Sequence, residues 1–213
     1  MIRSKAFSHD KEREYYSQSW PTEALNYEDL NQYLTPWLGD LSDGIFRGKL
    51  VLDIGAGEAT YTRMIAERYA PKLIVAIDLF QRRLLPAMRS SKLVNFTVVA
   101  GDCFRLPFRD GFFDVVFGSL LLCQLPDIDL VAQEIGRVLK PGGTYVGIEP
   151  NIRNPIIMGR FVFGRHSRNQ YLLRIKHIRQ FENAGFDCGV RYFYWKIPQV
   201  RSSLIGTCVG ILL

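Results

Sequence analysis

The sequence predicts an α/β fold: a doubly wound, mostly parallel sheet with helices on both faces. Short apolar runs, of the kind that is buried on both faces of a parallel sheet, alternate with amphipathic helical stretches. Strands that alternate with helices at this spacing favour right-handed crossovers within one open sheet. The 213 residues suffice for one compact domain with a substantial core, and 47% of them are hydrophobic.

The expected elements follow from these runs in chain order. Strands are predicted at 49–55, 72–78, 94–102, 113–121 and 144–150, and helices at 59–70, 80–89 and 131–140. Pro71 ends the first helix, and Pro141-Gly142-Gly143 ends the third. The tail adds a helix around 172–184, an aromatic strand around 190–196 and a final buried strand or helix over 203–213, and one strand of such a tail can run antiparallel.

Three strand ends carry the residues that point to a ligand. The first strand runs into Asp53-Ile54-Gly55-Ala56-Gly57, and glycines in a strand-to-helix turn let the backbone approach a ligand closely. Asp78 ends the second strand, where a carboxylate can accept both hydroxyls of a ribose. Gly101-Asp102-Cys103 ends the third, where the aspartate can accept from an adenine amino group. Ligands of open α/β sheets bind beyond such carboxyl ends.

The same residues resemble the class I S-adenosylmethionine-dependent methyltransferases. After the glycine turn, Asp78 and Asp102 come Leu106-Pro107-Phe108, then Phe113-Asp114-Val115-Val116, then Leu139-Lys140-Pro141-Gly142-Gly143. The nearest likeness is to the small-molecule subgroup that includes the quinone-biosynthesis methyltransferases. It is strong over roughly 45–150 and weak in the tail. Ala59 stands where many members have a third glycine.

The resemblance implies roles for particular residues. Asp53, Gly55, Ala56 and Gly57 would line the methionine part of S-adenosylmethionine, and Asp78 would hold its ribose. Asp102 with Gly101 and Cys103 would hold the adenine, against which Leu79 would pack. Ser119 and Leu120, at the end of the fourth strand, would face the methionine end. The product would be S-adenosylhomocysteine, and no metal is required.

The resemblance also implies a seven-stranded, Rossmann-like sheet and divides the chain into three parts of one domain. Residues 1–48 would form an N-terminal helical cap, 49–150 the cofactor-binding core, and 151–213 a substrate-side insertion with the C-terminal part of the sheet. The four cysteines form no C-x-x-C pair, so no metal or redox site is expected. No stretch approaches the roughly 20 apolar residues of a membrane span, and the N-terminus lacks a secretory apolar core. We therefore expect a cytoplasmic protein.

The net charge of +6 is unevenly distributed, which bears on the methyl acceptor. No acidic residue lies between Glu149 and Glu182, whereas that stretch holds seven arginines and lysines and two histidines. Arginine forks suit phosphate and carboxylate groups, so an anionic or lipid-linked small acceptor is expected, methylated on oxygen or carbon. Peripheral contact with an anionic membrane is the other use of such a stretch.

Residues that touch the acceptor or move its proton are harder to choose. Glu149 and His166 are the candidate general bases, because each can take a proton near neutral pH when suitably placed. Tyr16, Asn151, Arg153 and Arg165 are the candidate substrate contacts. All of them lie outside the family motifs.

Three alternatives stay open. A nucleic-acid methyltransferase acting on rRNA or tRNA fits the basic stretch, although Gly118-Ser119-Leu120-Leu121 lacks the Asn/Asp-Pro-Pro-aromatic motif of enzymes that methylate base amino groups. A module that binds S-adenosylmethionine without turnover would keep the same strand ends. An NAD(P)-dependent oxidoreductase would need glycine at Thr60 to complete its fingerprint.

Overall fold

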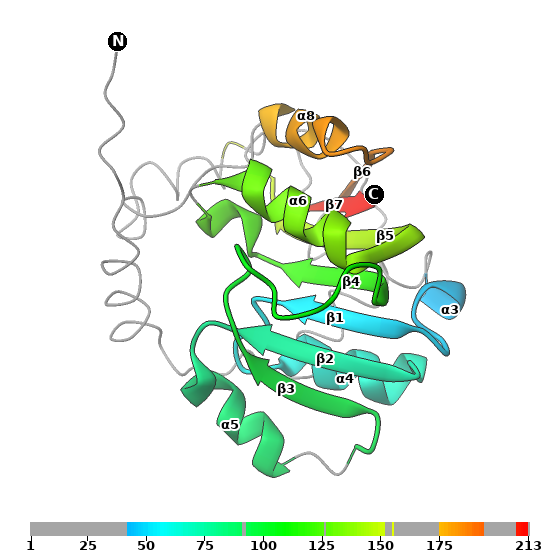
Figure 1. Ribbon diagram of the computed structural model, residues 1–213, viewed down its shortest axis with the longest axis vertical. Coiled ribbons are helices and arrows are strands. Elements are labelled where there is room, and N and C mark those ends of the chain that lie inside the picture. Colours follow the sequence, from blue (N-terminus) through cyan, green and yellow to red (C-terminus); the bar gives the residue numbers. More distant parts are fainter. Residues whose placement is uncertain are drawn as a thin grey trace.

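A seven-stranded sheet, in the order β3-β2-β1-β4-β5-β7-β6, forms the centre of the computed structural model (Figure 1). The structure describes residues 42–90, 93–125, 127–151, 155, 175–193 and 208–212. Strands β1 to β5 pair in parallel, and β7 pairs antiparallel with both β5 and β6. This arrangement confirms the predicted fold class, including the antiparallel strand in the tail.

The elements lie close to their predicted positions. The strands are β1 (Leu50–Ile54), β2 (Leu73–Asp78), β3 (Phe96–Ala100), β4 (Phe113–Ser119), β5 (Leu139–Pro150), β6 (Gly189–Phe193) and β7 (Cys208–Leu212). The helices are α3 (Ser42–Ile45), α4 (Thr60–Tyr69), α5 (Gln81–Ser90), the 3₁₀ turn η1 (Leu122–Gln124), α6 (Ile128–Val138) and α8 (Ile175–Asn183).

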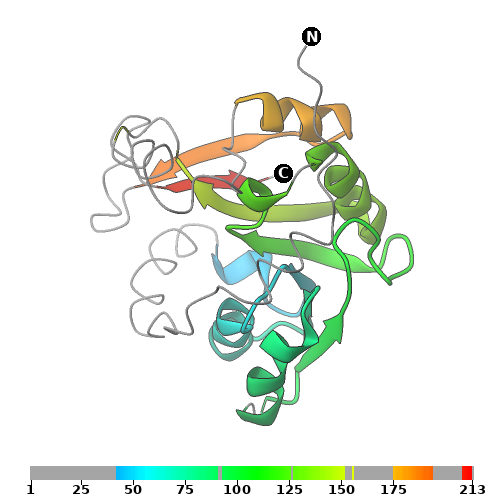
Figure 2. The same cartoon turned by 90° about the vertical axis from the view of Figure 1, so that its left-hand side faces the viewer.

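Helices cover both faces of the sheet because successive strand residues point to opposite sides. On one face, Leu52 of β1 packs in a cluster with Ile135 of α6 and Phe181 of α8. On the other, Val51 packs in a second cluster with Ile65 of α4. Figure 1 shows α6 in front of the sheet and α4 behind it, and Figure 2 shows α8 beside α6.

The bounds of α6 and the start of β5 differ from the prediction. Helix α6 begins at Ile128, three residues before the expected start, because the Asp127 side chain accepts the N–H of Leu130 and caps it. It also ends earlier, and the segment predicted as helix end and turn opens β5 instead. The register of β4 against β5 shifts between Phe113 and Val115, and Gly142 takes a positive φ of 72° there. A bulge at a glycine lets the strand absorb the extra residues.

Candidate functional site

The turn between β1 and α4 is held in a conformation that glycine favours. Gly55 and Gly57 have φ of 66° and 57°, and Ala59 has φ of 55°. Left-handed backbone is strained for a residue with a Cβ, which gives a physical reason for the glycine that the family often carries at position 59. A Cβ on Gly55 would lie 2.6 Å from Cδ1 of Leu121, so this turn packs directly on the segment after β4.

Asp78 joins the first two strand ends. Its Oδ2 accepts the N–H of Gly57 at 2.8 Å, and its Oδ1 accepts the N–H of Phe80 at 2.9 Å. The side chain is 6% exposed. An ionised carboxylate has about four lone-pair positions, so each oxygen of Asp78 can accept one further donor. The carboxylate that is predicted to bind the ribose is therefore held in place by the glycine turn.

A cation lies against this carboxylate. The Arg83 guanidinium of α5 is 3.8 Å from Asp78 Oδ2, and a Cβ on Gly57 would lie 2.7 Å from its Nη2. Sequence reasoning missed Arg83. The signal was available, since a residue five positions after a strand-end aspartate lies on the first turn of the following helix, back over the strand end.

Asp53 lies beneath the turn rather than on its surface. It is 2% exposed, and Oδ2 accepts the Thr62 hydroxyl at 2.5 Å. Burial raises its pKa to about 7, the Thr62 hydrogen bond partly offsets that rise, and the nearby charge of Asp78 adds to it. The structure thus places Asp53 where it supports the turn through α4.

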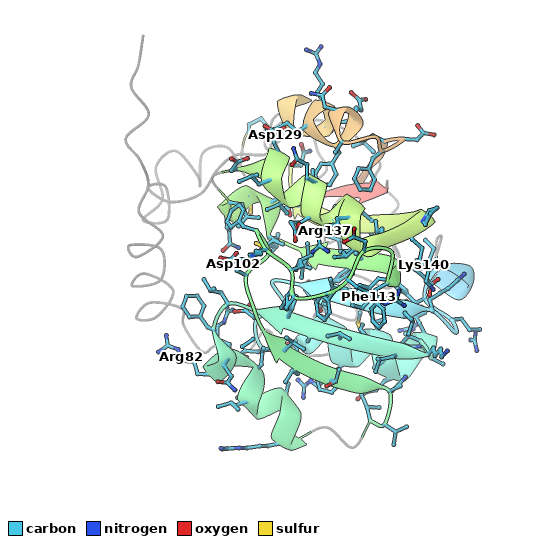
Figure 3. All side chains as sticks on the ribbon, viewed as in Figure 1. Arg82, Asp102, Phe113, Asp129, Arg137 and Lys140 are labelled. Carbon is cyan, nitrogen blue, oxygen red and sulfur yellow. The ribbon has the colours of Figure 1, made fainter. Side chains whose placement is uncertain are left out.

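The third strand end forms a tight turn of its own. Asp102 Oδ1 accepts the N–H of Phe104 at 2.9 Å, while Gly101 donates to the Asp78 carbonyl at 3.0 Å. A Cβ on Gly101 would lie 2.7 Å from Cδ1 of Ile77, so only glycine fits without movement. Leu79 is 37% exposed beside these groups. Figure 3 shows Asp102 at the end of the sheet toward which the arrowheads of β1 and β2 point. The predicted residues Asp78, Gly101 and Asp102 are therefore brought together.

The segment that follows Asp102 is held by an ion-pair clamp from α6. Arg137 donates to the carbonyls of Leu106 and Phe108 at 3.0 and 2.8 Å and to Glu134 at 2.8 Å. Glu134 in turn accepts the N–H of Leu106 at 2.8 Å. The guanidinium holds the pKa of Glu134 below its ordinary value. This clamp was missed from the sequence, although the i, i+3 spacing of Glu134 and Arg137 is a helical signal.

Removing this clamp should cost stability. We expect Arg137→Ala to lower the free energy of unfolding by about 2 kcal/mol, because two backbone carbonyls and Glu134 lose a charged donor. For a chain of this size that corresponds to a fall of roughly 6 °C in Tm, measured by differential scanning fluorimetry. Arg105→Ala, at an exposed arginine of the same segment, is the matched control and should change Tm by under about 2 °C. Equal effects in the two variants would contradict the clamp.

The segment after β4, residues 119–124, makes a strained turn. Leu120 has a positive φ of 53°, and its N–H donates to the Ile148 carbonyl at 2.7 Å. Its own carbonyl accepts from the Gln124 side chain. The Ser119 hydroxyl oxygen is shielded from solvent and finds no hydrogen-bond partner among the described residues. A buried polar atom left open in this way fits a ligand at the predicted methionine end.

The Glu149 side chain, at the end of β5, is bonded to the turn after β4. Its side chain is fully buried, and it accepts three backbone N–H groups: Leu121 at 3.1 Å and Leu122 at 2.7 Å on Oε1, and Cys123 at 3.1 Å on Oε2. Burial raises its pKa to about 7, against the lowering effect of these donors. A carboxylate turned into this turn does not support the interpretation of Glu149 as a general base facing the acceptor.

The remaining predicted contacts are placed only in part. Asn151, just after β5, is 1% exposed, and its contact with an acceptor stays a prediction. Tyr16, Arg153, Arg165 and His166 lie outside the described residues. Within the described ranges no group of His, Cys, Asp and Glu could hold a metal ion. No helix among those ranges is long and apolar enough to span a bilayer.

Comparison with known proteins indicates the same class of domain. The fold and the three strand ends define a Rossmann-like methyltransferase domain, and residues 52–147 match the family described as "Methyltransferase domain". A methyltransferase of Thermotoga maritima that depends on S-adenosylmethionine shares the fold, with a TM-score of 0.68 and 16% identity over 95% of this chain and 93% of that one. Residues 52–147 are therefore similar to this methyltransferase domain family, and the chain has the fold of S-adenosylmethionine-dependent methyltransferases.

Two curated relatives extend the likeness beyond the fold. A demethylmenaquinone methyltransferase of Staphylococcus carnosus (strain TM300) is 29% identical over 158 residues, which cover 70% of this chain and 64% of that protein. A malonyl-acyl-carrier-protein O-methyltransferase of Marinomonas sp. (strain MWYL1) is 41% identical over 100 residues, covering 46% and 36%. The chain thus spans less than two thirds of the length of either relative.

Proposed function

We propose that this protein binds S-adenosylmethionine and transfers its methyl group to a small acceptor that is anionic or lipid-linked. The observation that carries the proposal is the bonding of Asp78 to the Gly57 N–H, which fixes a ribose-type carboxylate against the glycine turn. The family match over 52–147 supports the same cofactor.

The described residues fit the parts of this cofactor. Asp78 has lone pairs free for ribose hydroxyls, and Asp102 can accept an adenine amino group while still capping its own turn. Leu79, exposed beside them, offers an apolar surface to an aromatic ring. The open hydroxyl of Ser119 fits the methionine end.

When bound, S-adenosylmethionine would supply a methyl group on a positively charged sulfur. An acceptor lone pair would bond to the methyl carbon in line, and the sulfur would leave as the thioether of S-adenosylhomocysteine. The protein contributes mainly by positioning. Gly55 and Gly57 would let the backbone approach the cofactor, which Asp78 and Asp102 would hold by its ribose and adenine. Holding donor and acceptor in near-attack geometry can itself supply several kcal/mol of the barrier reduction. The proton of an oxygen or carbon acceptor would pass to a general base, for which His166, outside the described residues, stays a candidate.

The acceptor class rests on two supports. One relative is named for a quinone and the other for a malonyl group, and these are respectively lipid-like and anionic molecules. The basic stretch from Arg153 to Arg179 offers arginine forks for phosphate or carboxylate. Peripheral membrane contact through the same stretch would bring the protein to a lipid-linked acceptor.

Calorimetry of the whole chain tests this proposal first. We expect micromolar binding of S-adenosylmethionine and no binding of NADH or NADPH, which would exclude the oxidoreductase alternative. Transfer of a labelled methyl group to demethylated quinols and to malonyl thioesters should then exceed transfer to tRNA or rRNA. Binding without transfer to any acceptor would favour the non-catalytic module, and preferred transfer to RNA would overturn the small-molecule proposal.

A further inference from the structure

The turn after β4 is held by several hydrogen bonds. Leu120 sits in left-handed backbone, which for leucine persists only where the surroundings enforce it. Three separate groups do so. The Ile148 carbonyl accepts the Leu120 N–H, and the Gln124 side-chain amide donates to the Leu120 carbonyl. The Glu149 carboxyl accepts the next three backbone N–H groups. Strain enforced in this way is a feature of functional sites.

Glu149 is the costly part of this arrangement. A fully buried carboxyl is expensive unless its hydrogen bonds are satisfied, and here both oxygens are used on backbone N–H groups of one short turn. A hydrophobic side chain at this position would leave those three N–H groups unpaired. The carboxyl therefore fixes the path of residues 121–123.

The turn also touches the cofactor loop. Leu121, whose N–H is bonded to Glu149, packs so closely on Gly55 that a Cβ there would lie 2.6 Å from its Cδ1. The open Ser119 hydroxyl lies at the start of the same turn. A shift of the turn would thus move both surfaces that face the predicted methionine end.

We propose that Glu149 is a positioning residue, which sets the turn of residues 119–123 as the seat for the amino-acid part of S-adenosylmethionine. This inference rests on the proposed function. The adenine side has its own support in the clamp of Glu134 and Arg137 on segment 104–110. Glu149 and Glu134 therefore hold two separate segments, which under the proposed function would lie toward opposite ends of the cofactor.

Two ligands separate the two ends. S-adenosylhomocysteine carries the amino-acid part, whereas 5′-methylthioadenosine lacks it. We expect Glu149→Gln, which presents an amide N–H to the Cys123 N–H, to weaken S-adenosylhomocysteine about tenfold and 5′-methylthioadenosine less than twofold in calorimetry. Glu134→Gln is the matched control and should weaken both ligands by a similar factor.

The outcomes are distinct. If folded Glu149→Gln binds S-adenosylhomocysteine like the wild type, or loses both ligands equally, the positioning role is wrong. If the wild type binds neither ligand, the proposed function fails and the inference fails with it. Binding of both by the wild type with a selective loss in the variant supports both.

A wild-type measurement guards against a variant that does not fold. Cys123 is 3% exposed, and its Sγ lies 3.6 Å from the Leu120 carbonyl, so its alkylation reports opening of the turn. We expect S-adenosylhomocysteine to slow alkylation of Cys123 by iodoacetamide several-fold, followed by peptide mass spectrometry, and 5′-methylthioadenosine to leave it unchanged. Equal protection by both ligands would overturn the proposal.

Discussion

Asp78→Ala is expected to weaken S-adenosylmethionine binding about 30-fold or more. If both ribose hydroxyls donate to this carboxylate, losing them costs on the order of 2 kcal/mol, which is the stated factor in Kd. The variant also frees the Gly57 and Phe80 N–H groups, so the glycine turn loses the bond that orders it. Calorimetric titration of both proteins at the same ionic strength measures the ratio.

Two further variants show whether the carboxylate itself is responsible. Asp78→Asn keeps the size of the side chain but replaces one acceptor oxygen with a donor, so we expect most of the loss to persist. Asp129→Ala, at an exposed aspartate on α6, should bind as the wild type does. A folded Asp78→Ala protein whose Kd lies within about threefold of the wild type would rule out the ribose role.

The strand ends could be predicted because they depend on short-range rules. A buried parallel strand is a continuous apolar run, and the residue after it must turn, so Asp53, Asp78 and Asp102 were readable as strand-end residues. That Asp78 would bond the Gly57 N–H follows from the neighbouring placement of β1 and β2. Local pattern and topology agree at these positions.

What the sequence did not reveal depends on contacts between distant residues. Glu149 and Leu122 are 27 positions apart, and Arg137 and Leu106 are 31 apart, so neither bond leaves a periodic signal. Gly118 and Gly147 look like ordinary strand residues, yet a Cβ on either would come within 3.0 Å of the Tyr145 ring or hydroxyl. Tyr145 fills that space and stacks on Phe181, with ring centroids 5.3 Å apart. Such roles follow only from the packed sheet.

Stability is expected to fall as the pH rises from about 4 to 7, and Asp53 is one cause. Burial raises the pKa of Asp53 to about 7 from an ordinary value near 3.8. Below pH 4 the carboxyl is protonated in both the folded and the unfolded chain. Between the two values the unfolded chain ionises while the folded one stays protonated, so the free energy of unfolding decreases, by a few kcal/mol at most. Above pH 7 both forms are ionised and the effect levels off.

Asp53→Asn should remove this part of the slope, because the amide mimics the protonated carboxyl and its oxygen still accepts the Thr62 hydroxyl. Urea denaturation at pH 5, 6, 7 and 8 measures the free energies. Glu149, whose pKa burial also raises to about 7, should leave a residual slope in the single variant and a smaller one in the double variant with Glu149→Gln. The exposed Asp187→Asn changes the charge equally and should keep the wild-type slope. A wild type that gains stability from pH 5 to 8, with the same course in Asp53→Asn, would mean that burial does not raise the pKa of Asp53 and that its carboxyl is ionised throughout this range.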